Sequence, residues 1–304
     1  MTFLQEAVVF LAAAVIAVPL SRRLGVGAVL GYLVAGLLIG PFAFGLISDV
    51  DNILHFAELG VVLLLFVIGL ELQPTRLWAL RRSVFGLGAV QVVVTSLLLA
   101  LAAIALGVPP TAAAIAGSAL SLSSTAFALQ LLAEKNQLTT QHAILLFQDL
   151  AAIPLLAIIP LLGAGLAVSQ GWDATTVAKM VAVLAVVAGG GRWLLRPLLR
   201  IAASSANREV FIAAALLVVM GTALLMQQVG LSMALGSFLA GVLLADSEYR
   251  HELEADIEPF KGLLLGLFFI AVGMSVDLGL VVRTPWTVLG LVLGLVAIKA
   301  MVLY

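Results

Sequence analysis

Apolar segments long enough to cross a membrane recur along the whole chain and are separated by short polar breaks. A run of about 20 apolar residues spans the hydrocarbon core of a bilayer as a helix. The segments fall at residues 3–20, 26–47, 53–71, 84–107, 110–132, 143–166, 177–199, 209–229, 231–246, 261–276 and 286–304. Because 63% of the 304 residues are hydrophobic and only 10% are charged, no stretch remains for a soluble domain. We therefore expect an all-α membrane protein with eleven spans.

The basic residues predict how these spans are oriented. One set of alternate loops holds only Lys179 and Arg283. The other set holds Arg22, Arg23, Arg76, Arg81, Arg82, Lys135, Arg192, Arg196, Arg200, Arg208, Arg250 and Lys261. Since Lys and Arg accumulate in cytoplasmic loops, we expect a multi-pass cell (inner) membrane protein with its N-terminus outside. The chain has no cysteine, which excludes disulfides and thiolate metal sites within it.

One acidic residue lies inside a predicted span. The segment 143–162, AILLFQDLAAIPLLAIIPLL, contains Asp149 and no basic residue. A carboxylate at this depth costs about 2.5 to 3.5 kcal/mol, so an intramembrane acid is a candidate functional residue. Its natural partner is Lys299, the one basic residue inside a span, although such a pair could also serve only to lock two helices together. Because no second acid is clearly internal, a membrane aspartyl protease is excluded and we expect no enzyme.

Oxygen-bearing groups surround Asp149 in the sequence. Gln148 precedes it, and Pro154 leaves the carbonyl of Leu150 without its helical partner. The preceding span contains five hydroxyl residues, Ser118, Ser121, Ser123, Ser124 and Thr125. Such hydroxyls often only join helices, but beside a carboxylate and an interrupted helix they are also typical of a cation site. Hard cations take oxygen ligands, so this neighbourhood predicts a site for a monovalent cation at Asp149.

Two further segments have a pattern of their own. Gly27 and Gly31, and Gly36 and Gly40, have the spacing of a helix-packing face, within the bundle or between protomers. The segment 246–260, DSEYRHELEADIEPF, concentrates acidic residues on the side that is otherwise basic. Glu252 and Asp256 would share a face of a short surface helix. This acidic segment is either simply solvated or a docking site for a cytoplasmic partner.

Several long motifs in order resemble those of the Kef-type, glutathione-gated potassium/proton antiporters of the monovalent cation:proton antiporter superfamily. They are LGVGAVLGYLVAGLLIGP, LGVVLLLFVIGLELQP, ALSLSSTAFALQLLAEKNQLTT, ILLFQDLAAIPLLAIIPLL and ALGSFLAGVLLADSEYRHELEADIEPFKGLLLGLFFIAVGMSVDL. The resemblance covers nearly all of the chain. It implies an inverted-repeat antiporter fold with discontinuous crossing helices that works as a homodimer, and residues 1–304 as its transmembrane domain.

The resemblance also assigns residues. It implies that Asp149 takes the cation or the proton beside Gln148, that Lys299 is the family's intramembrane lysine, and that Ser123, Ser124 and Thr125 lie in the first broken helix. The segment 246–260 resembles the family's cytoplasmic regulatory loop, with Glu254 and Asp256 as its acids. This loop contacts a cytoplasmic nucleotide-binding domain where nucleotide and glutathione bind, which is expected after residue 304, as are the second crossing helix and the last span.

The chain departs from the family pattern at one place. Family members usually carry a short Gly-Arg-x-x-Phe segment between the equivalents of His142 and Ala143. Without it, Asp149 lies about 10 Å along the span from its inner end, at 1.5 Å per residue.

These observations predict exchange of a monovalent cation, K⁺ by the resemblance, for a proton. A single acid holds a cation or a proton but not both, so the expected mechanism is alternating access with one-for-one stoichiometry. Two alternatives use the same residues. One is a gated K⁺ channel, and the other is a membrane sensor that transports nothing and signals through the acidic segment 246–260.

Overall fold

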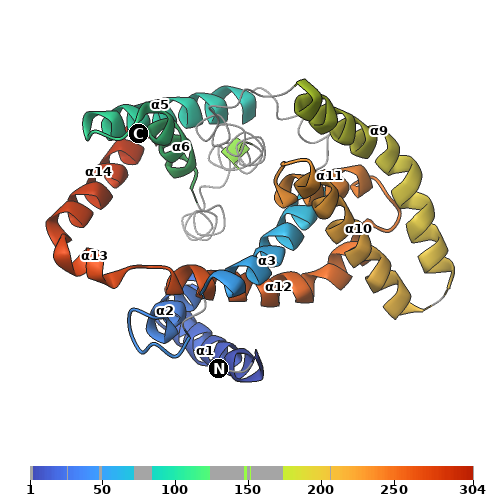
Figure 1. Ribbon diagram of the computed structural model, residues 1–304, viewed down its shortest axis with the longest axis horizontal. Helices are drawn as coiled ribbons and strands as arrows, with labels where there is room; N and C mark the ends of the chain where they lie inside the picture. The colour runs from blue at the N-terminus through green and yellow to red at the C-terminus, as the bar shows by residue number, and fades with distance from the viewer. Residues whose placement is uncertain are drawn as a thin grey trace.

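The computed structural model describes residues 3–25, 27–47, 50–71, 84–123, 147–148, 151, 174–205 and 207–303. Within these ranges every regular element is helical (Figure 1). The helices are α1 (Phe3–Arg23), α2 (Ala28–Ile39), α3 (Val50–Glu71), the π-helical turn η1 (Val84–Gly88), α5 (Ala89–Ala105), α6 (Pro110–Ser121), α9 (Ala174–Ser204), α10 (Arg208–Gln228), α11 (Met233–Leu244), α12 (Arg250–Met274), α13 (Leu278–Arg283) and α14 (Pro285–Leu303). Six helices of the described part are long and apolar enough to cross a membrane, which agrees with the all-helical membrane fold that the sequence predicts.

Most of these helices form one packed group, which we call the scaffold region. It consists of α1, α2, α3, α9, α10, α11 and α12. The helix α3 packs along both α11 and α12, α12 also packs against α2, and α10 lies between α9 and α11 (Figure 1). Both clusters of buried hydrophobic side chains among the described residues belong to this region, one centred on Phe66 and Leu244 and the other on Ile270 and Met274.

Glycines allow the scaffold helices to touch backbone to backbone. A Cβ on Gly241 of α11 would lie 3.0 Å from Cα of Gly69 in α3, which is closer than side chains tolerate. A Cβ on Gly40 would lie 2.9 Å from Cα of Met274, and one on Gly31 would lie 2.9 Å from Cβ of Ser21 in α1. The glycine face predicted from the sequence therefore packs within the bundle at Gly31 and Gly40. Gly27 is different, because it precedes α2 at a φ of 79° and has open space where a Cβ would be.

The remaining helices form a smaller group, which we call the site region. It consists of η1, α5, α6, α14 and residues 147–148. The helix α5 packs against α6 and α14, and the short α13 leads from the end of α12 to α14, so that the C-terminal helix lies beside α5 (Figure 1). The side chain of Phe147 also packs against this group, because a Cβ on Gly88 would lie 2.7 Å from Cγ of Phe147.

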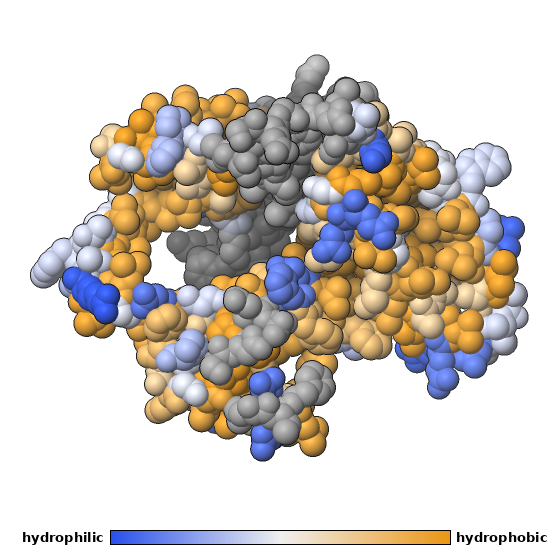
Figure 2. Space-filling view, viewed as in Figure 1, coloured by the Kyte–Doolittle hydropathy of each residue, from blue (hydrophilic) through white to orange (hydrophobic). Residues whose placement is uncertain are grey.

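The surface of the described part has the composition expected for contact with lipid. Many large hydrophobic side chains are exposed, among them Leu4, Val15, Val93, Leu217 and Val282. Figure 2 shows that hydrophobic side chains cover much of the visible face and that hydrophilic ones gather in separate patches. An apolar surface of this extent is unusual for a soluble monomer and is the ordinary exterior of a membrane domain.

Two predicted boundaries differ from the structure. The apolar segment 26–47 forms a helix only over Ala28–Ile39, followed by turns up to residue 47. The segment 246–260 is not a loop throughout, because α12 begins at Arg250 and continues through Pro259 to Met274. Leu253 and Ile257, one helical turn apart, are fully buried in the scaffold core and hold this part of the segment in a helix. The many charges of this segment predict a solvated loop, but its two apolar residues are the ones that fix its structure.

Candidate functional site

The site begins at a helix that stops inside the membrane domain. The helix α6 starts at Pro110 and ends at Ser121, and Leu122 has an extended backbone with φ −69° and ψ 151°. The final carbonyls of a helix lack backbone partners, as does the N–H of a residue placed just beyond an abrupt end. The Ser121 hydroxyl donates to the carbonyl of Ser118 at 2.7 Å, which satisfies one of these groups within α6.

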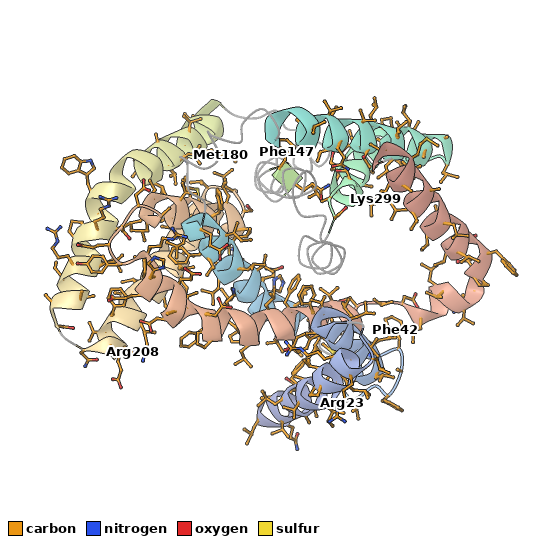
Figure 3. The ribbon with its side chains drawn as sticks, turned by 180° about the vertical axis from the view of Figure 1, so that it is seen from behind. Arg23, Phe42, Phe147, Met180, Arg208 and Lys299 are labelled. Carbon is orange, nitrogen blue, oxygen red and sulfur yellow. The ribbon has the colours of Figure 1, made fainter. Side chains whose placement is uncertain are left out.

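Lys299 satisfies the next carbonyls from another part of the chain. Its Nζ donates to the carbonyl oxygens of Leu120 at 2.9 Å and of Leu122 at 2.6 Å. Figure 3 shows Lys299 on α14, next to the described end of α6. Amino groups at a helix C-terminus interact favourably with the partial negative charge that the aligned peptide dipoles place there. Lys299 therefore joins α14 to the end of α6 through both hydrogen bonding and charge.

Gln148 satisfies the N–H group beyond the same end. Its Oε1 accepts a hydrogen bond from the backbone N–H of Ser123 at 2.9 Å. Its Nε2 donates to Oε1 of Gln91 in α5 at 2.8 Å. With 3% of its surface exposed, the Gln148 side chain is removed from solvent, and its amide is bonded at both ends. The residue directly before Asp149 thus links α5 to the end of α6.

Gln91 and Thr95 were not identified from the sequence. They lie one helical turn apart on α5, are 5% and 0% exposed, and are joined by a 3.1 Å hydrogen bond from Nε2 of Gln91 to Oγ1 of Thr95. A signal was present, because a polar pair at i and i+4 interrupts the apolar segment 84–107 on one helix face. The pair lies in a different span from the hydroxyl-rich segment and from Gln148, and only the tertiary structure brings the three together.

The structure brings together three of the predicted site residues: Ser123, Gln148 and Lys299. Asp149, Ser124, Thr125 and Pro154 lie outside the described residues, as does the position between His142 and Ala143. The predicted pairing of Lys299 with Asp149 therefore stays a prediction. In the described part, Lys299 bonds to the backbone of α6 instead of to a carboxylate.

The chemistry of the assembled groups is that of an oxygen-rich polar site. Carbonyl, amide and hydroxyl oxygens come from α6, residue 148 and α5, and one amino group comes from α14. Within the described ranges, no three His, Asp or Glu side chains cluster as they would to bind a transition metal. Oxygen groups at the end of a helix inside a membrane domain suit a hard monovalent cation, and an amino group nearby can take the place of that cation when it is absent.

The acidic residues predicted for regulation have different surroundings. Asp256 is 8% exposed, and its Oδ1 accepts from both Nε and Nη2 of Arg208, at 3.1 and 2.9 Å. This ion pair joins the first half of α12 to the start of α10. Glu254 is only partly buried and lies 3.9 Å from Nδ1 of His251. Glu252 is exposed. The two acids that were expected to share one helix face therefore differ: Glu252 faces solvent, and Asp256 is paired with Arg208.

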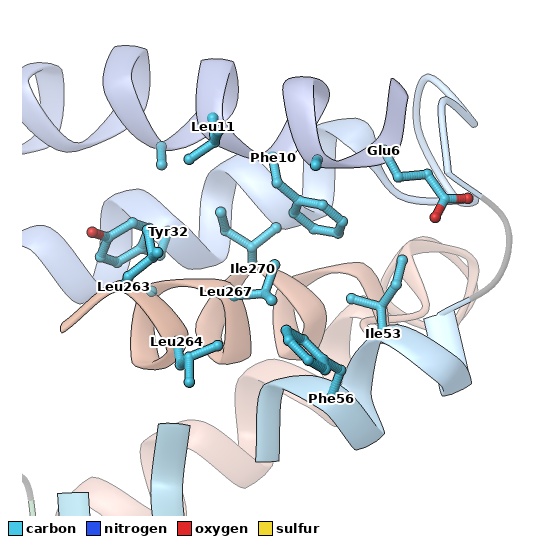
Figure 4. A pocket seen from close by; sticks show the side chains of 13 residues that line it. Glu6, Phe10, Leu11, Tyr32, Ile53, Phe56, Leu263, Leu264, Leu267 and Ile270 are labelled. Carbon is cyan, nitrogen blue, oxygen red and sulfur yellow. The ribbon is translucent and has the colours of Figure 1, made fainter. Parts of the chain in front are cut away.

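An apolar cavity lies away from these polar groups. It has a volume of about 390 Å³, lies between α1, α2, α3 and α12, and is lined by residues such as Phe10, Tyr32, Phe56 and Ile270 (Figure 4). Glu6 is the one carboxylic acid in its lining and lies at one end (Figure 4). A cavity so apolar cannot stabilise a bare cation, so we place the candidate site at the end of α6.

A fold of apolar helices, in which one helix ends beside buried polar groups from other spans, is typical of a secondary transporter of ions. The transmembrane domain of the sodium/hydrogen exchangers matches residues 9–304, and the chain therefore belongs to this family. This match covers every element of both the scaffold and the site region apart from the first residues of α1.

Within this family the chain is similar to glutathione-regulated potassium-efflux system proteins. It is 56% identical to KefC of Klebsiella pneumoniae subsp. pneumoniae over 99% of this chain and 49% of that protein. It is 55% identical to KefC of Klebsiella pneumoniae strain 342, with the same coverage. The Kef-type resemblance predicted from the sequence is thus confirmed. The chain spans about half the length of these curated relatives.

Among solved structures, the fold is similar to that of the sodium proton antiporter MjNhaP1 from Methanocaldococcus jannaschii. The TM-score is 0.58 at 16% sequence identity, with 90% of this chain and 70% of that chain covered. At this identity the likeness concerns the fold alone. It confirms the antiporter fold expected from the motifs.

Proposed function

We propose that this chain exchanges a monovalent cation, K⁺, for a proton by alternating access, with Asp149 binding each in turn. One carboxylate neutralises one positive charge, so cation and proton compete for it. Competition at a site that opens to one side at a time couples the two fluxes and gives one-for-one exchange. Ser123, Ser124, Thr125 and the Oε1 of Gln148 supply the uncharged oxygen ligands in this proposal.

The observation that carries the proposal is the end of α6. Backbone groups that would be costly to leave unpaired in a membrane are held there by Lys299 and Gln148, which come from two other spans. Gln148 is the neighbour of Asp149 in the sequence, so the carboxylate is tethered within one residue of this network. The amino group of Lys299 can hold the site together while Asp149 carries neither cation nor proton.

Regulation and assembly are proposed by similarity to the relatives, whose names describe glutathione-regulated potassium efflux. We propose that the protein acts as a homodimer in the cell (inner) membrane with its N-terminus outside. We further propose that Glu254, Asp256 and the surrounding segment 246–260 face a cytoplasmic nucleotide-binding domain or an ancillary cytoplasmic protein. In this proposal, nucleotide and glutathione bind to the cytoplasmic domain.

Proton flux in proteoliposomes tests the central claim. Wild-type protein should move protons uphill when a K⁺ gradient is imposed, and Asp149→Asn should abolish this coupled flux. Asp277→Asn, which changes an exposed acid at the start of α13 and keeps its capping oxygen, should exchange like the wild type. Coupled flux that persists in Asp149→Asn contradicts the proposal.

The same assay separates the alternatives and identifies the cation. A gated channel would pass cations without driving protons uphill, and a sensor would give no flux while still binding its partner. A comparison of K⁺, Na⁺ and Rb⁺ identifies the preferred cation, for which the proposal expects K⁺.

A further inference from the structure

A chain of three hydrogen bonds runs from α5 to the end of α6. Nε2 of Gln91 donates to Oγ1 of Thr95 at 3.1 Å, and Nε2 of Gln148 donates to Oε1 of Gln91 at 2.8 Å. The backbone N–H of Ser123 then donates to Oε1 of Gln148 at 2.9 Å. The three side chains are at most 5% exposed, so water does not replace these partners.

The direction of this chain is set by its backbone end. The N–H of Ser123 can only donate, so Gln148 must turn its oxygen toward it and its NH₂ group toward Gln91. If the Gln148 amide were reversed, two donors would face each other, and a buried polar group left unpaired costs about 1 to 3 kcal/mol. Gln91 must then present its oxygen to Gln148 and its own NH₂ group to Thr95.

We propose that Gln91 is a positioning residue for cation exchange: by accepting from the NH₂ group of Gln148, it holds the amide in the orientation that the N–H of Ser123 selects. This inference rests on the proposed function, in which Asp149 is the exchanging carboxylate. A carbonyl oxygen has a second lone pair, so Oε1 of Gln148 can bond Ser123 and still face a cation. A reversed amide would present N–H dipoles to that cation and repel it. Thr95 holds Gln91 in place one turn away on the same helix.

This role differs from simple helix packing in what it changes. Gln91 and Gln148 are 57 residues apart in the sequence and come from different spans, so the bond between them is not part of the local structure of α5. If Gln91 only stabilised the bundle, its loss would lower the amount of folded protein and leave cation affinity alone. If it positions Gln148, its loss lowers cation affinity and leaves the maximal rate of the folded protein nearly unchanged.

The first test measures coupled proton flux against K⁺ concentration in proteoliposomes of the complete protein. Gln91→Met keeps the length of the side chain and removes the amide. We expect its KM for K⁺ to rise about tenfold, the effect of losing one well-made hydrogen bond, with kcat within about twofold of wild type. Thr95→Val should raise KM by a smaller factor, about threefold, because Gln91 loses only its anchor.

Thr222→Val is the matched control for Thr95→Val. Thr222 is also buried, but its hydroxyl donates within its own helix, to the carbonyls of Val218 and Val219 at 2.8 and 3.0 Å. Its substitution should leave KM unchanged. Should Gln91→Met fail to fold, the comparison of Thr95→Val with Thr222→Val still decides, and equal KM values in the two variants overturn the proposal.

A double-mutant cycle then tests whether Gln91 acts through Gln148. The readout is the rise in Tm that K⁺ produces in purified protein, which follows cation affinity even where transport is slow. In a Gln148→Met background, Gln91→Met should weaken K⁺ stabilisation no further, whereas independent residues would give additive losses. If the losses are additive, or if Gln91→Met has the KM of the wild type, the role of Gln91 is overturned. The proposed function still stands in that case, provided that the wild-type protein exchanges K⁺ for protons. Absence of exchange in the wild type overturns the proposed function and this inference together.

Discussion

The scaffold region and the site region differ in how far along the chain the partners of their buried polar side chains lie. In the scaffold, buried hydroxyls donate to carbonyls of their own helix: Ser21 to Val18, Thr222 to Val218 and Ser237 to Ala234. In the site region, Gln91, Gln148 and Lys299 bond to groups of other elements that lie 25 to 179 residues away in the sequence. In the described scaffold, the ion pair of Arg208 with Asp256 also joins two different helices. It lies in the segment for which regulation is proposed.

This difference has a physical consequence for each region. Hydroxyls that bond within their own helix leave helix faces free to pack, and glycines bring those faces into backbone contact. The scaffold therefore gains its stability from close packing, which is sensitive to volume. The site region instead depends on hydrogen bonds between spans, and these break when one element shifts. Substitutions in the scaffold should thus alter stability more than exchange, and substitutions in the site region should do the reverse.

The largest effect is expected where two scaffold helices touch. Gly241→Ala places a methyl group 3.0 Å from Cα of Gly69 and from N of Leu70, so α3 and α11 must separate. We expect a loss of about 2 to 4 kcal/mol of stability, typical of overpacking against backbone. Thermal unfolding in detergent measures it. Gly221→Ala on α10 has open space at the same atom and should be neutral or slightly stabilising.

The second effect is expected at the end of α6. Lys299→Ala removes the donor to the carbonyls of Leu120 and Leu122. Coupled flux should fall at least about tenfold, because unpaired carbonyls cost about 1 to 3 kcal/mol and the end of α6 can no longer hold its position. Proteoliposome flux measures the change. Lys179→Ala on α9 removes an exposed lysine of the scaffold and should exchange normally. If the two variants behave alike, the distinction between the regions fails.

The smallest effect comes from two serines with the same local bond. Ser121 donates to the carbonyl of Ser118 at 2.7 Å and Ser237 to that of Ala234 at 2.9 Å, and both are 0% exposed. Each substitution by alanine should cost less than about 1 kcal/mol, because such bonds contribute little within a helix. Only Ser121→Ala should also slow exchange, by about twofold to fivefold, since it frees a carbonyl at the end of α6. Equal flux in both variants would show that the end of α6 tolerates an unpaired group.

Much of the fold followed from the sequence because the bilayer acts on each segment separately. Segments such as 53–71 and 209–229 match α3 and α10 within a few residues, since apolar length alone decides whether a helix can span. Boundaries were wrong where burial depended on neighbours. The helix α12 begins as early as Arg250 because Leu253 and Ile257 are buried in the scaffold core. The many charged residues around these two positions gave no sign of that burial.

The candidate site was predicted in part. Polar and charged side chains are rare inside apolar spans because burying them in a membrane costs free energy. Gln148, which stands beside a carboxylate, and Lys299 could therefore be identified as site residues without knowing their neighbours. Gln91 and Thr95 could not, because a polar pair on one helix has the same pattern whether it packs, faces lipid or joins a site. Their role depends on Gln148, which lies 57 residues beyond Gln91 in the chain.

The sequence by itself determined that this protein is a membrane domain of apolar helices and that its rare internal polar residues are candidates for ion exchange. The energetic reason is local, because each apolar span and each buried polar group has its cost irrespective of what lies nearby. Only the tertiary structure decided that Lys299 meets the carbonyls of Leu120 and Leu122 and that Gln148 donates to Gln91. Hydrogen bonds need two partners within about 3 Å, and which spans supply them depends on how the helices pack.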